Sequence, residues 1–375
     1  MEADFLQQCF TALMAVDTVN PPGGEEAAAR LLQKLFEARG MPATVQRLGN
    51  GRANFTAQCG QGTPVLEFNG HLDVVPCPGN WHTPPLQATP AGDRVYGRGA
   101  CDMKGGLAAM CAAYAAVYER QDTLQGTLRL CFVADEESAN AGIKAFQAVY
   151  PPADMAVIGE PTGLQVAIAH RGVARFSIRL EGEERHAALS PLADTAVQAA
   201  ARAILALQEM NMPLQNRRHE VLPPPSIAVT RVQGYEKDNV IPGTVELLTD
   251  FRLLPGDTES SAAAQIREAL RRAGVQRYTL HTHFFMPGAA LPSRDSFVQL
   301  CCRVTGQILG RNQQPTAFGA SCEQCFALQA GTRAVICGPG SLDQAHTVDE
   351  FVEADQLRQA VDCYTALALQ ILEGD

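Results

Sequence analysis

The sequence predicts an α/β protein with a mixed sheet covered by helices on both faces, and a smaller α+β domain inserted into it. Short, almost wholly apolar runs are typical of strands buried on both faces. Helical segments separate these runs, as in layered α/β folds. A central stretch instead alternates hydrophobic and polar residues, which favours half-exposed strands. A length of 375 residues also favours two domains.

The larger domain is expected to begin with a helix, a loop of sequence VNPPGGEE and a second helix that ends at Gly40. An Ala-rich helix follows a Gly-containing turn, and a last helix closes the chain. Apolar runs such as TPVLEFNG and TRAVICGPG predict the buried strands. The strands are expected at 63–70, 126–135, 154–159 and 332–340, and the two later helices at 101–120 and 352–373.

The central stretch predicts the order strand, helix, strand, strand, helix, strand, which is that of a split ferredoxin-like unit. We therefore expect residues 173–286 to form the inserted domain, with 1–172 and 287–375 forming the larger one. The six elements are expected at 172–182, 193–210, 225–234, 244–255, 259–274 and 275–284.

The composition is that of a folded globular protein, with 46% hydrophobic and 19% charged residues. No apolar run approaches the ~18 residues that span a bilayer. The first residues, MEADFLQQCF, lack a basic region and a cleavage site, so no signal peptide is expected. Twelve scattered cysteines in apolar contexts favour reduced, buried thiols in the cytoplasm. The formal charge of −10 disfavours nucleic acid and anionic membranes as partners.

Polar side chains follow each of the predicted buried strands, and another opens the Ala-rich helix. Ligand sites of open α/β sheets lie at the carboxyl ends of the strands, so these side chains are expected to converge. Imidazoles and carboxylates together suit a pair of metal ions, and a carboxylate can bridge two cations. The converging residues are His71, Asp73, Asp102, Glu136, Glu137, Glu160 and His346.

Each of these residues also has a simpler explanation. His71 could be an ordinary turn histidine, and a Glu136-Glu137 pair is often a solvated strand end. Asp102 stands near a helix N-terminus, where a carboxylate is favoured in any case, and His346 could be a loop histidine. Because all of them occur together at strand ends, the two-metal interpretation is favoured.

The motifs NGHLDVVP, YGRGACDMKGG, ADEES, GEPT and GPGSLDQAHTVDE stand in this order along the chain. Together they resemble the di-zinc amidohydrolase and exopeptidase family. That family includes acetylornithine deacetylase, succinyl-diaminopimelate desuccinylase, aminoacylases and the glutamate-releasing carboxypeptidases. The similarity runs from the N-terminal helices to about Glu353.

The resemblance implies a role for each converging residue. His71 and Glu160 would hold one divalent metal ion, and Glu137 and His346 the other, with zinc expected and cobalt or manganese as alternatives. Asp102 would bridge the ions and precede a cis peptide bond with Met103, and Asp73 would lie behind His71. Glu136 would be the general base that takes a proton from the bridging water and passes it to the leaving amine.

In the inserted domain, the resemblance implies that Asn239 and Arg252 bind the carboxylate of the substrate. A guanidinium fork suits that group, although a surface salt bridge is the simpler interpretation of Arg252. His186 would reach the active site of the other subunit of a homodimer formed through this lid domain, and would donate to the oxyanion. Its simpler interpretation is a surface loop histidine.

The expected substrate is an N-acyl amino acid, as for acetylornithine deacetylase, and GPGSLDQAH is similar to that enzyme. The stretches HAALSPLAD and LPPPSIAV lean towards the desuccinylase, but Cys325 stands where desuccinylases carry an arginine. Arg185 and Thr195-Ala196-Val197 also depart from the usual pattern. Di- or tripeptide exopeptidase, carboxypeptidase-type and desuccinylase activities remain alternatives, as does a non-catalytic binding protein.

Two further pairs are interpreted as structural. Cys322 and Cys325 form a C-x-x-C without a second cysteine pair at zinc-binding spacing, and we interpret them as core or pocket-wall thiols. His281 and His283 alternate on a predicted strand, and we interpret them as lid surface rather than a metal site.

Overall fold

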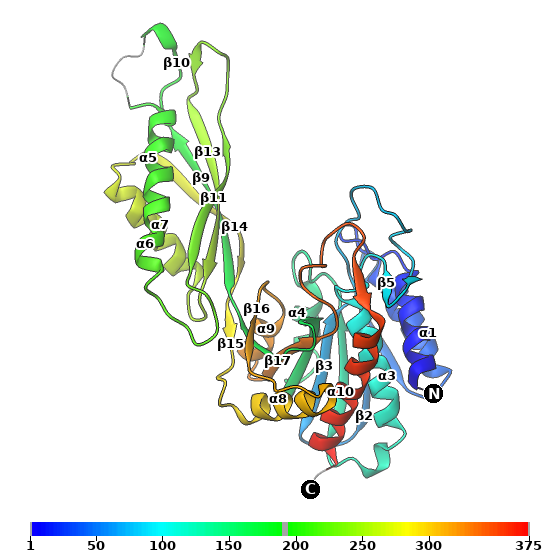
Figure 1. Cartoon of the computed structure of the whole chain (residues 1–375). Coiled ribbons are helices and arrows are strands. Elements are labelled where there is room, and N and C mark those ends of the chain that lie inside the picture. Colours follow the sequence, from blue (N-terminus) through cyan, green and yellow to red (C-terminus); the bar gives the residue numbers. More distant parts are fainter. Residues whose placement is uncertain (1, 190–193, 374–375) are drawn as a thin grey trace. The chain divides into compact units, whose positions relative to one another are not determined.

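The computed structural model describes residues 2–189 and 194–373, which form two compact units (Figure 1). The first unit comprises the chain up to Ala169, Leu291–Phe318 and the residues from Cys322 onward. The second comprises His170–Ala290 and the short segment Gly319–Ser321. That short segment lies far from the rest of its unit in sequence, and no pattern in the sequence indicated it.

The first unit is built on a mixed sheet in the order β1-β2-β6-β3-β7-β17-β8, with β16 paired to β8. Strands β6, β3, β7 and β17 are parallel neighbours, whereas β1 and β2 are antiparallel to their neighbours. The predicted fold class is therefore confirmed. The strands are β1 Ala43–Gly49, β2 Arg52–Gly60, β3 Val65–His71, β6 Thr127–Val133, β7 Met155–Pro161, β8 Ala167–His170, β16 Thr316–Phe318 and β17 Arg333–Gly338.

Helix α3, Lys104–Tyr118, is buried along almost its whole length and packs against α1 and α10. Its small residues permit this close packing: a Cβ on Gly106 would lie 2.5 Å from the main-chain oxygen of Gly159. The other helices of this unit are α1 Glu2–Met14, α2 Glu25–Glu37, α4 Ala141–Gln147, α8 Ser296–Leu309, α9 Gln324–Gln329 and α10 Ala354–Leu372, with a 3₁₀ turn at Gln121–Thr123.

Two predicted helices begin later than expected. The helix predicted at 101–120 begins at Lys104, so Asp102 lies in the preceding loop. The helix predicted from 352 begins at Ala354, because Phe351–Glu353 forms β18 in a small separate sheet with β5 and β4. Val352 pairs with Val95 there and is fully buried. Strands β4 and β5 are Thr89–Ala91 and Arg94–Tyr96.

The second unit has an antiparallel sheet in the order β11-β13-β9-β14, with helices α5 and α7. Its main elements follow the chain in the predicted order β9-α5-β11-β13-α7-β14, with small elements added between them. These are β9 Gly172–Glu181, β10 Arg185–His186, a 3₁₀ turn at Ala187–Leu189, α5 Ala196–Glu209, α6 Asn211–Leu214, β11 Ser226–Gln233, β12 Val240–Ile241, β13 Thr244–Leu253, α7 Glu259–Arg272, β14 Tyr278–Met286 and β15 Ala289–Ala290.

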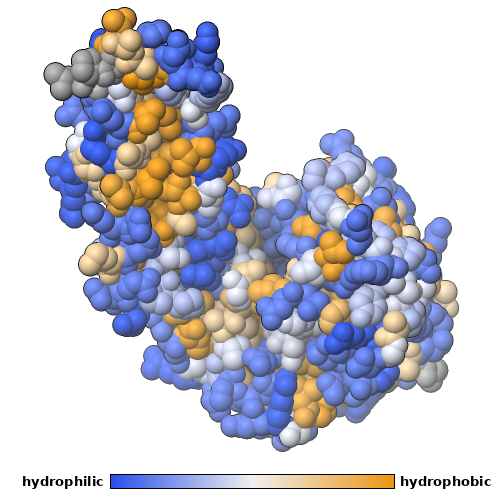
Figure 2. Space-filling view, turned by 45° about the horizontal axis from the view of Figure 1, so that its top comes forward, coloured by the Kyte–Doolittle hydropathy of each residue, from blue (hydrophilic) through white to orange (hydrophobic). Residues whose placement is uncertain are grey.

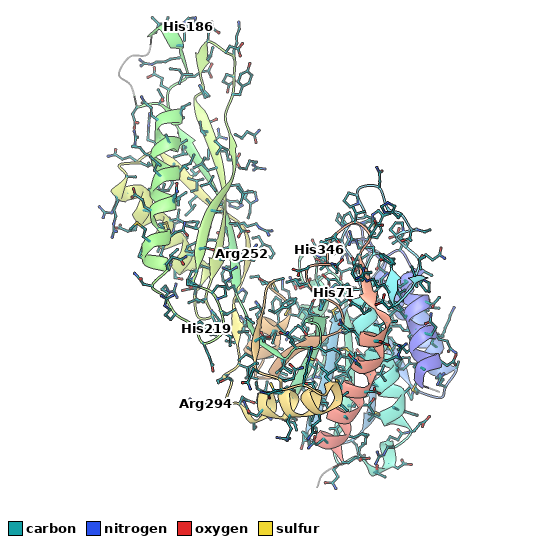
Figure 3. All side chains as sticks on the ribbon, in the orientation of Figure 1. His71, His186, His219, Arg252, Arg294 and His346 are labelled. Atoms are coloured by element: carbon teal, nitrogen blue, oxygen red, sulfur yellow. The ribbon has the colours of Figure 1, made fainter. Side chains whose placement is uncertain are left out.

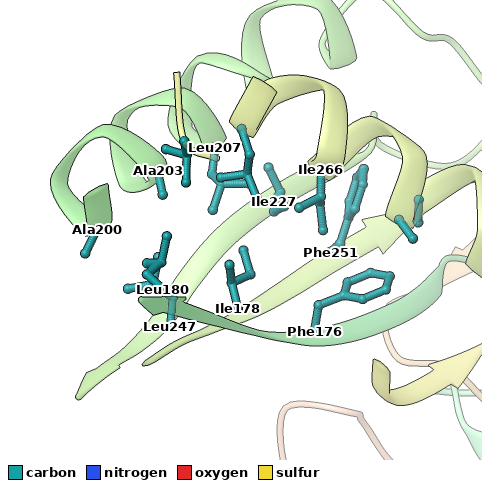
Figure 4. Close-up of a cluster of buried hydrophobic side chains, with 14 of the residues drawn as sticks. Phe176, Ile178, Leu180, Ala200, Ala203, Leu207, Ile227, Leu247, Phe251 and Ile266 are labelled. Atoms are coloured by element: carbon teal, nitrogen blue, oxygen red, sulfur yellow. The ribbon is translucent and has the colours of Figure 1, made fainter. Parts of the chain in front are cut away.

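The core of the second unit lies between the sheet and its two helices (Figure 4). Phe176 and Ile178 on β9, Phe251 on β13, Ile266 on α7 and Ala203 on α5 are all fully buried. Every second residue of β13 faces this core, and this periodicity made the strand predictable.

Helix α5 was predicted at 193–210 and begins at Ala196, where Thr195 caps it by accepting the backbone N–H of Gln198. The SPLA part of the HAALSPLAD motif, residues 190–193, lies outside the described residues, and with it the first residue of the predicted helix. Thr195 was one of the departures from the family pattern, and its capping hydrogen bond gives it a structural role.

One face of the second unit carries an apolar groove. A groove of about 1050 Å³ is lined by residues of α5, α6 and α7, including the exposed Leu205 and Met212. Figure 2 shows hydrophobic residues gathered on one face of this unit. Among the described residues, no helix has the length and apolar character to cross a membrane.

Candidate metal centre

The expected ligands lie at one edge of the first unit's sheet, because β3, β6, β7 and β17 are parallel neighbours in it. His71 is the last residue of β3, and Glu160 lies near the end of β7. Glu136 and Glu137 follow β6, and His346 stands in the loop after β17. The structure brings all of these side chains together with Asp102.

Asp102 lies between the two histidines. Its Oδ1 is 3.1 Å from Nε2 of His71, and its Oδ2 is 3.4 Å from Nε2 of His346. Glu160 lies 3.6 Å from His71, and Glu137 lies 3.0 Å from His346. Two groups of potential ligands, His71-Asp102-Glu160 and Asp102-Glu137-His346, therefore share one carboxylate. Figure 3 labels both histidines.

Asp73 supports this arrangement through its carboxylate and its main chain. The carboxylate accepts the backbone N–H groups of Glu136 and Glu137, each at 3.1 Å, and so holds the two glutamates. The main-chain oxygen lies 2.8 Å from Nδ1 of His71, whereas the carboxylate lies 3.7 Å away. A proton on Nδ1 therefore leaves Nε2 free to bind a metal.

The electrostatics of the site follow from burial and close charges. Burial opposes a charge on His71, but its hydrogen bond to Asp102 and the Glu160 carboxylate raise its pKa well above the usual value. Hydrogen bonds to Asp102 and Glu137 raise the pKa of His346 to about 10. Burial raises the pKa of Glu160, and the Asp102 charge adds to this. These shifts follow from the close approach of several carboxylates to the two imidazoles.

This donor set fits a pair of divalent cations. Three carboxylates and two imidazoles converge. His71 and Glu160 belong to one group, and His346 and Glu137 belong to the other. Oxygen and nitrogen ligands of this kind suit zinc, and Asp102, which belongs to both groups, would be shared between the two cations. Cations would offset the charge that the buried carboxylates otherwise leave unbalanced.

Glu136 lies beside the first group rather than within the ligand pairs: it forms a separate group with His71 and Glu137. Burial raises its pKa well above the usual value for a glutamate. The peptide bond between Asp102 and Met103 is cis, which confirms that prediction.

The remaining site residues expected from the sequence lie in the second unit (Figure 3). His186 on β10 is exposed, and its Nε2 lies 3.0 Å from the side-chain amide of Asn239. Arg252 on β13 pairs with Asp250 at 2.6 Å. Both His281 and His283 are exposed on β14, as predicted.

Several supporting residues were not found from the sequence. Asn20 donates to Asp73 at 2.8 Å and to Asp135 at 3.0 Å, although its loop showed only turn residues. Glu350 and Arg98 form a buried ion pair behind Asp102. The signal that could have indicated Glu350 was its position directly before the apolar pair Phe351-Val352.

Known proteins resemble this chain over nearly its whole length. An acetylornithine deacetylase of Erwinia tasmaniensis is 31% identical over 350 residues, which cover 90% of this chain and 88% of that protein. A dinuclear metal-binding peptidase of the M20 family from Bacillus subtilis has a similar fold, with a TM-score of 0.75, 18% identity and 99% of both chains covered. An M20 family metallo-carboxypeptidase from Sulfolobus solfataricus has a TM-score of 0.79 at 18% identity, with 96% of this chain and 98% of that chain covered.

The fold and the paired ligand groups define a metallohydrolase that acts on amide bonds. The chain belongs to the peptidase family M20/M25/M40, whose model matches residues 68–370. The resemblance inferred from the sequence motifs is therefore confirmed.

Proposed function

We propose that this enzyme removes the acyl group from an N-acyl amino acid by metal-dependent hydrolysis of its amide bond. The observation that carries the proposal is the pair of ligand groups joined through Asp102. The 31% identity to an acetylornithine deacetylase supports an acyl amino acid as the substrate class.

In this proposal His71 and Glu160 would hold one divalent cation, and Glu137 and His346 would hold the other, with Asp102 as a ligand shared by the two groups. The cations are zinc, with cobalt or manganese as alternatives. When bound, they supply Lewis-acid polarisation of the amide carbonyl and acidify a water molecule.

Glu136 is the proposed general base. Its side chain groups with His71 and Glu137, and Asp73 holds its backbone N–H at 3.1 Å. Glu136 accepts the proton of the attacking water and delivers it to the nitrogen of the leaving amine. The products are a free carboxylate and a free amine.

The second unit contains the proposed lid, which comprises 173–286, and the proposed catalytic domain comprises 1–172 and 287–375. Arg252 and Asn239 bind the carboxylate of the substrate. Arg252 pairs with Asp250 in this structure, and the substrate carboxylate takes the place of Asp250 in the proposed complex. His186 donates to the oxyanion in the active site of the partner subunit of a homodimer. The exposed apolar surface of the lid supports an interface there.

The twelve thiols are free, and eleven of them are buried. This agrees with the proposed cytoplasmic location, where thiols stay reduced.

The test is a hydrolysis panel with metal analysis. N-acetyl, N-succinyl and N-carbamoyl amino acids and di- and tripeptides are compared at fixed metal content, before and after chelation. The proposal predicts two cations per chain, with an N-acetyl amino acid hydrolysed with the highest kcat/KM. A preference for peptides would assign the chain to the exopeptidases instead, and a preference for succinyl substrates to the desuccinylases. Absence of hydrolysis by the metal-loaded protein would contradict a catalytic role.

A further inference from the structure

A buried carboxylate stands four residues after His346. Glu350 is fully buried, and its partner Arg98 has an exposed fraction of only 1%. Glu350 directly precedes β18, so its position is fixed by the pairing of that strand with β5. Nothing in the proposed chemistry uses this ion pair.

Glu350 connects two separate segments of the chain. Its Oε1 accepts the backbone N–H groups of Cys101 at 2.9 Å and of Asp102 at 3.0 Å. Its Oε2 accepts a hydrogen bond from Arg98, and its main-chain oxygen accepts the N–H of Gly97 at 2.9 Å. The segment 97–102, which carries Asp102, is thus held by the residue that ends the His346 loop.

Arg98 completes the arrangement by balancing the charge of Glu350. Its guanidinium also donates to the main-chain oxygen of Pro76 at 3.2 Å and lies 5.1 Å from the ring centroid of Trp81. A buried carboxylate that loses such a partner is strongly destabilised. Both halves of the pair therefore hold the Glu350 carboxylate where it accepts the two backbone N–H groups.

We propose that Glu350 is a positioning residue for the metal centre: it fixes Asp102 relative to His346, so that both ligand groups hold their geometry. The proposal rests on the assignment of Asp102 and His346 as ligands in the proposed function. Groups that orient metal ligands typically change metal affinity or activity by about 10–100-fold when they are replaced.

The simpler alternative is that this ion pair only stabilises the fold. The chain offers a matched control, because Glu67 and Arg129 form another buried pair at 2.7 Å in the same unit. Glu67 accepts from that arginine, and no described hydrogen bond joins it to a predicted ligand. Glu67→Gln therefore reports the cost of disturbing a buried pair alone.

The experiment compares Glu350→Gln with Glu67→Gln in the full-length protein. Metal affinity is measured by competition with a chromophoric chelator, and thermal unfolding is measured in excess chelator. The introduced glutamine side chain keeps the shape of glutamate but has one acceptor oxygen, so at this position it cannot satisfy both Arg98 and the two backbone N–H groups. We expect Glu350→Gln to lose about 10–100-fold in metal affinity and to lower kcat more than it changes KM. Glu67→Gln should lose stability but keep wild-type affinity.

Arg98→Lys is the second variant, since it keeps the positive charge but loses the guanidinium fork. Its metal affinity should lie between those of the wild type and Glu350→Gln. If Glu350→Gln does not fold, the metal affinity of Arg98→Lys tests the proposal in its place. Wild-type affinity in Glu350→Gln, or in Arg98→Lys where the other variant does not fold, would overturn the proposal. A wild-type protein that binds no cation would overturn the proposed function as well, so the two failures are distinguishable.

Discussion

The two units hold their candidate site residues in different ways. In the first unit, His71 and Asp102 are buried and contact each other, and the backbone around them is held by Asp73 and Glu350. In the second unit, His186 and Asn239 are exposed. They contact each other, and each also accepts a backbone N–H of the adjacent 3₁₀ turn at Ala187–Leu189. The comparison teaches that the five candidate metal ligands all come from one unit and contact one another there, whereas the candidate residues of the second unit lie on its surface.

The sheets explain this difference. In the first unit, β6 and β7 are buried along their whole length, so an ionisable side chain within a strand needs a buried partner, as Arg129 has in Glu67. The candidate ligands lie instead at or beyond the strand ends. In the second unit, the strands alternate, as in the burial pattern of β13, and polar groups occur along their whole length. A polar residue at a strand end of the first unit therefore indicates a functional site more strongly than a polar residue on a strand of the second unit does.

The largest effect is expected for Asp102→Ala, which removes the carboxylate that the two candidate ligand groups share. Because both histidines contact this carboxylate, we expect the loss of both cations and of all measurable hydrolysis. Metal content after gel filtration and activity are the measurements. Asp93→Ala, which removes an exposed carboxylate of the same unit, is the control. An Asp102→Ala protein with full metal content and full rate would show that the centre is assigned wrongly.

The second prediction separates the two adjacent glutamates. Glu136→Gln should keep its cations but lose at least about 100-fold in kcat, the lower range for removal of a general base. Glu137→Gln should instead weaken cation binding, because this residue contacts His346. The same two assays distinguish them, and an exchange of the two phenotypes would reverse their proposed roles.

The third prediction tests whether the lid acts on a partner. His186→Ala should keep its cations and lose about 100-fold in kcat, the scale for one oxyanion donor. Refolded together with Glu136→Ala, it should form heterodimers with one intact site, so activity should reappear. Inactive mixtures in which heterodimers are shown to form would mean that His186 does not act across subunits.

The fourth and smallest effect concerns substrate binding. Arg252→Gln should raise KM about tenfold or more for substrates with a free carboxylate, in line with the loss of a charged hydrogen bond. Substrates in which that carboxylate is amidated should show no such change. Arg231→Gln is the matched control, because Arg231 also pairs with an acidic neighbour in this sheet, Glu246. Equal KM values for both variants would indicate that Arg252 is only a surface ion pair.

Much of the fold was predictable because its patterns are local. The apolar runs of β3, β6, β7 and β17 and the alternation of β13 each reflect the burial of one strand. Strand β1 was missed because its residues are half-buried or exposed, with no clear alternation. Strand β18 was missed because three residues next to a helix are too few to show a period.

The candidate ligands were predictable for a similar reason, since His71 and Glu160 are polar residues at the ends of apolar runs. The hydrogen bonds behind them were not, because they join segments far apart in sequence. Asn20 and Asp73 are 53 positions apart, and Glu350 and Asp102 are 248 apart. Such contacts depend on the complete fold and leave no periodic signal in the sequence.

The distribution of thiols provides a built-in reporter of unfolding. Eleven cysteines are buried, and Cys77 alone is partly exposed. Burial raises the pKa of Cys59 and of Cys325 to about 12, so their reactive thiolate forms are scarce in the native state. Alkylation of the native enzyme should therefore modify Cys77 first, and each other position only as its own element opens. Mass spectrometry of timed labelling would then rank the opening of α1, α3, β17 and α10 within one molecule, without any introduced probe.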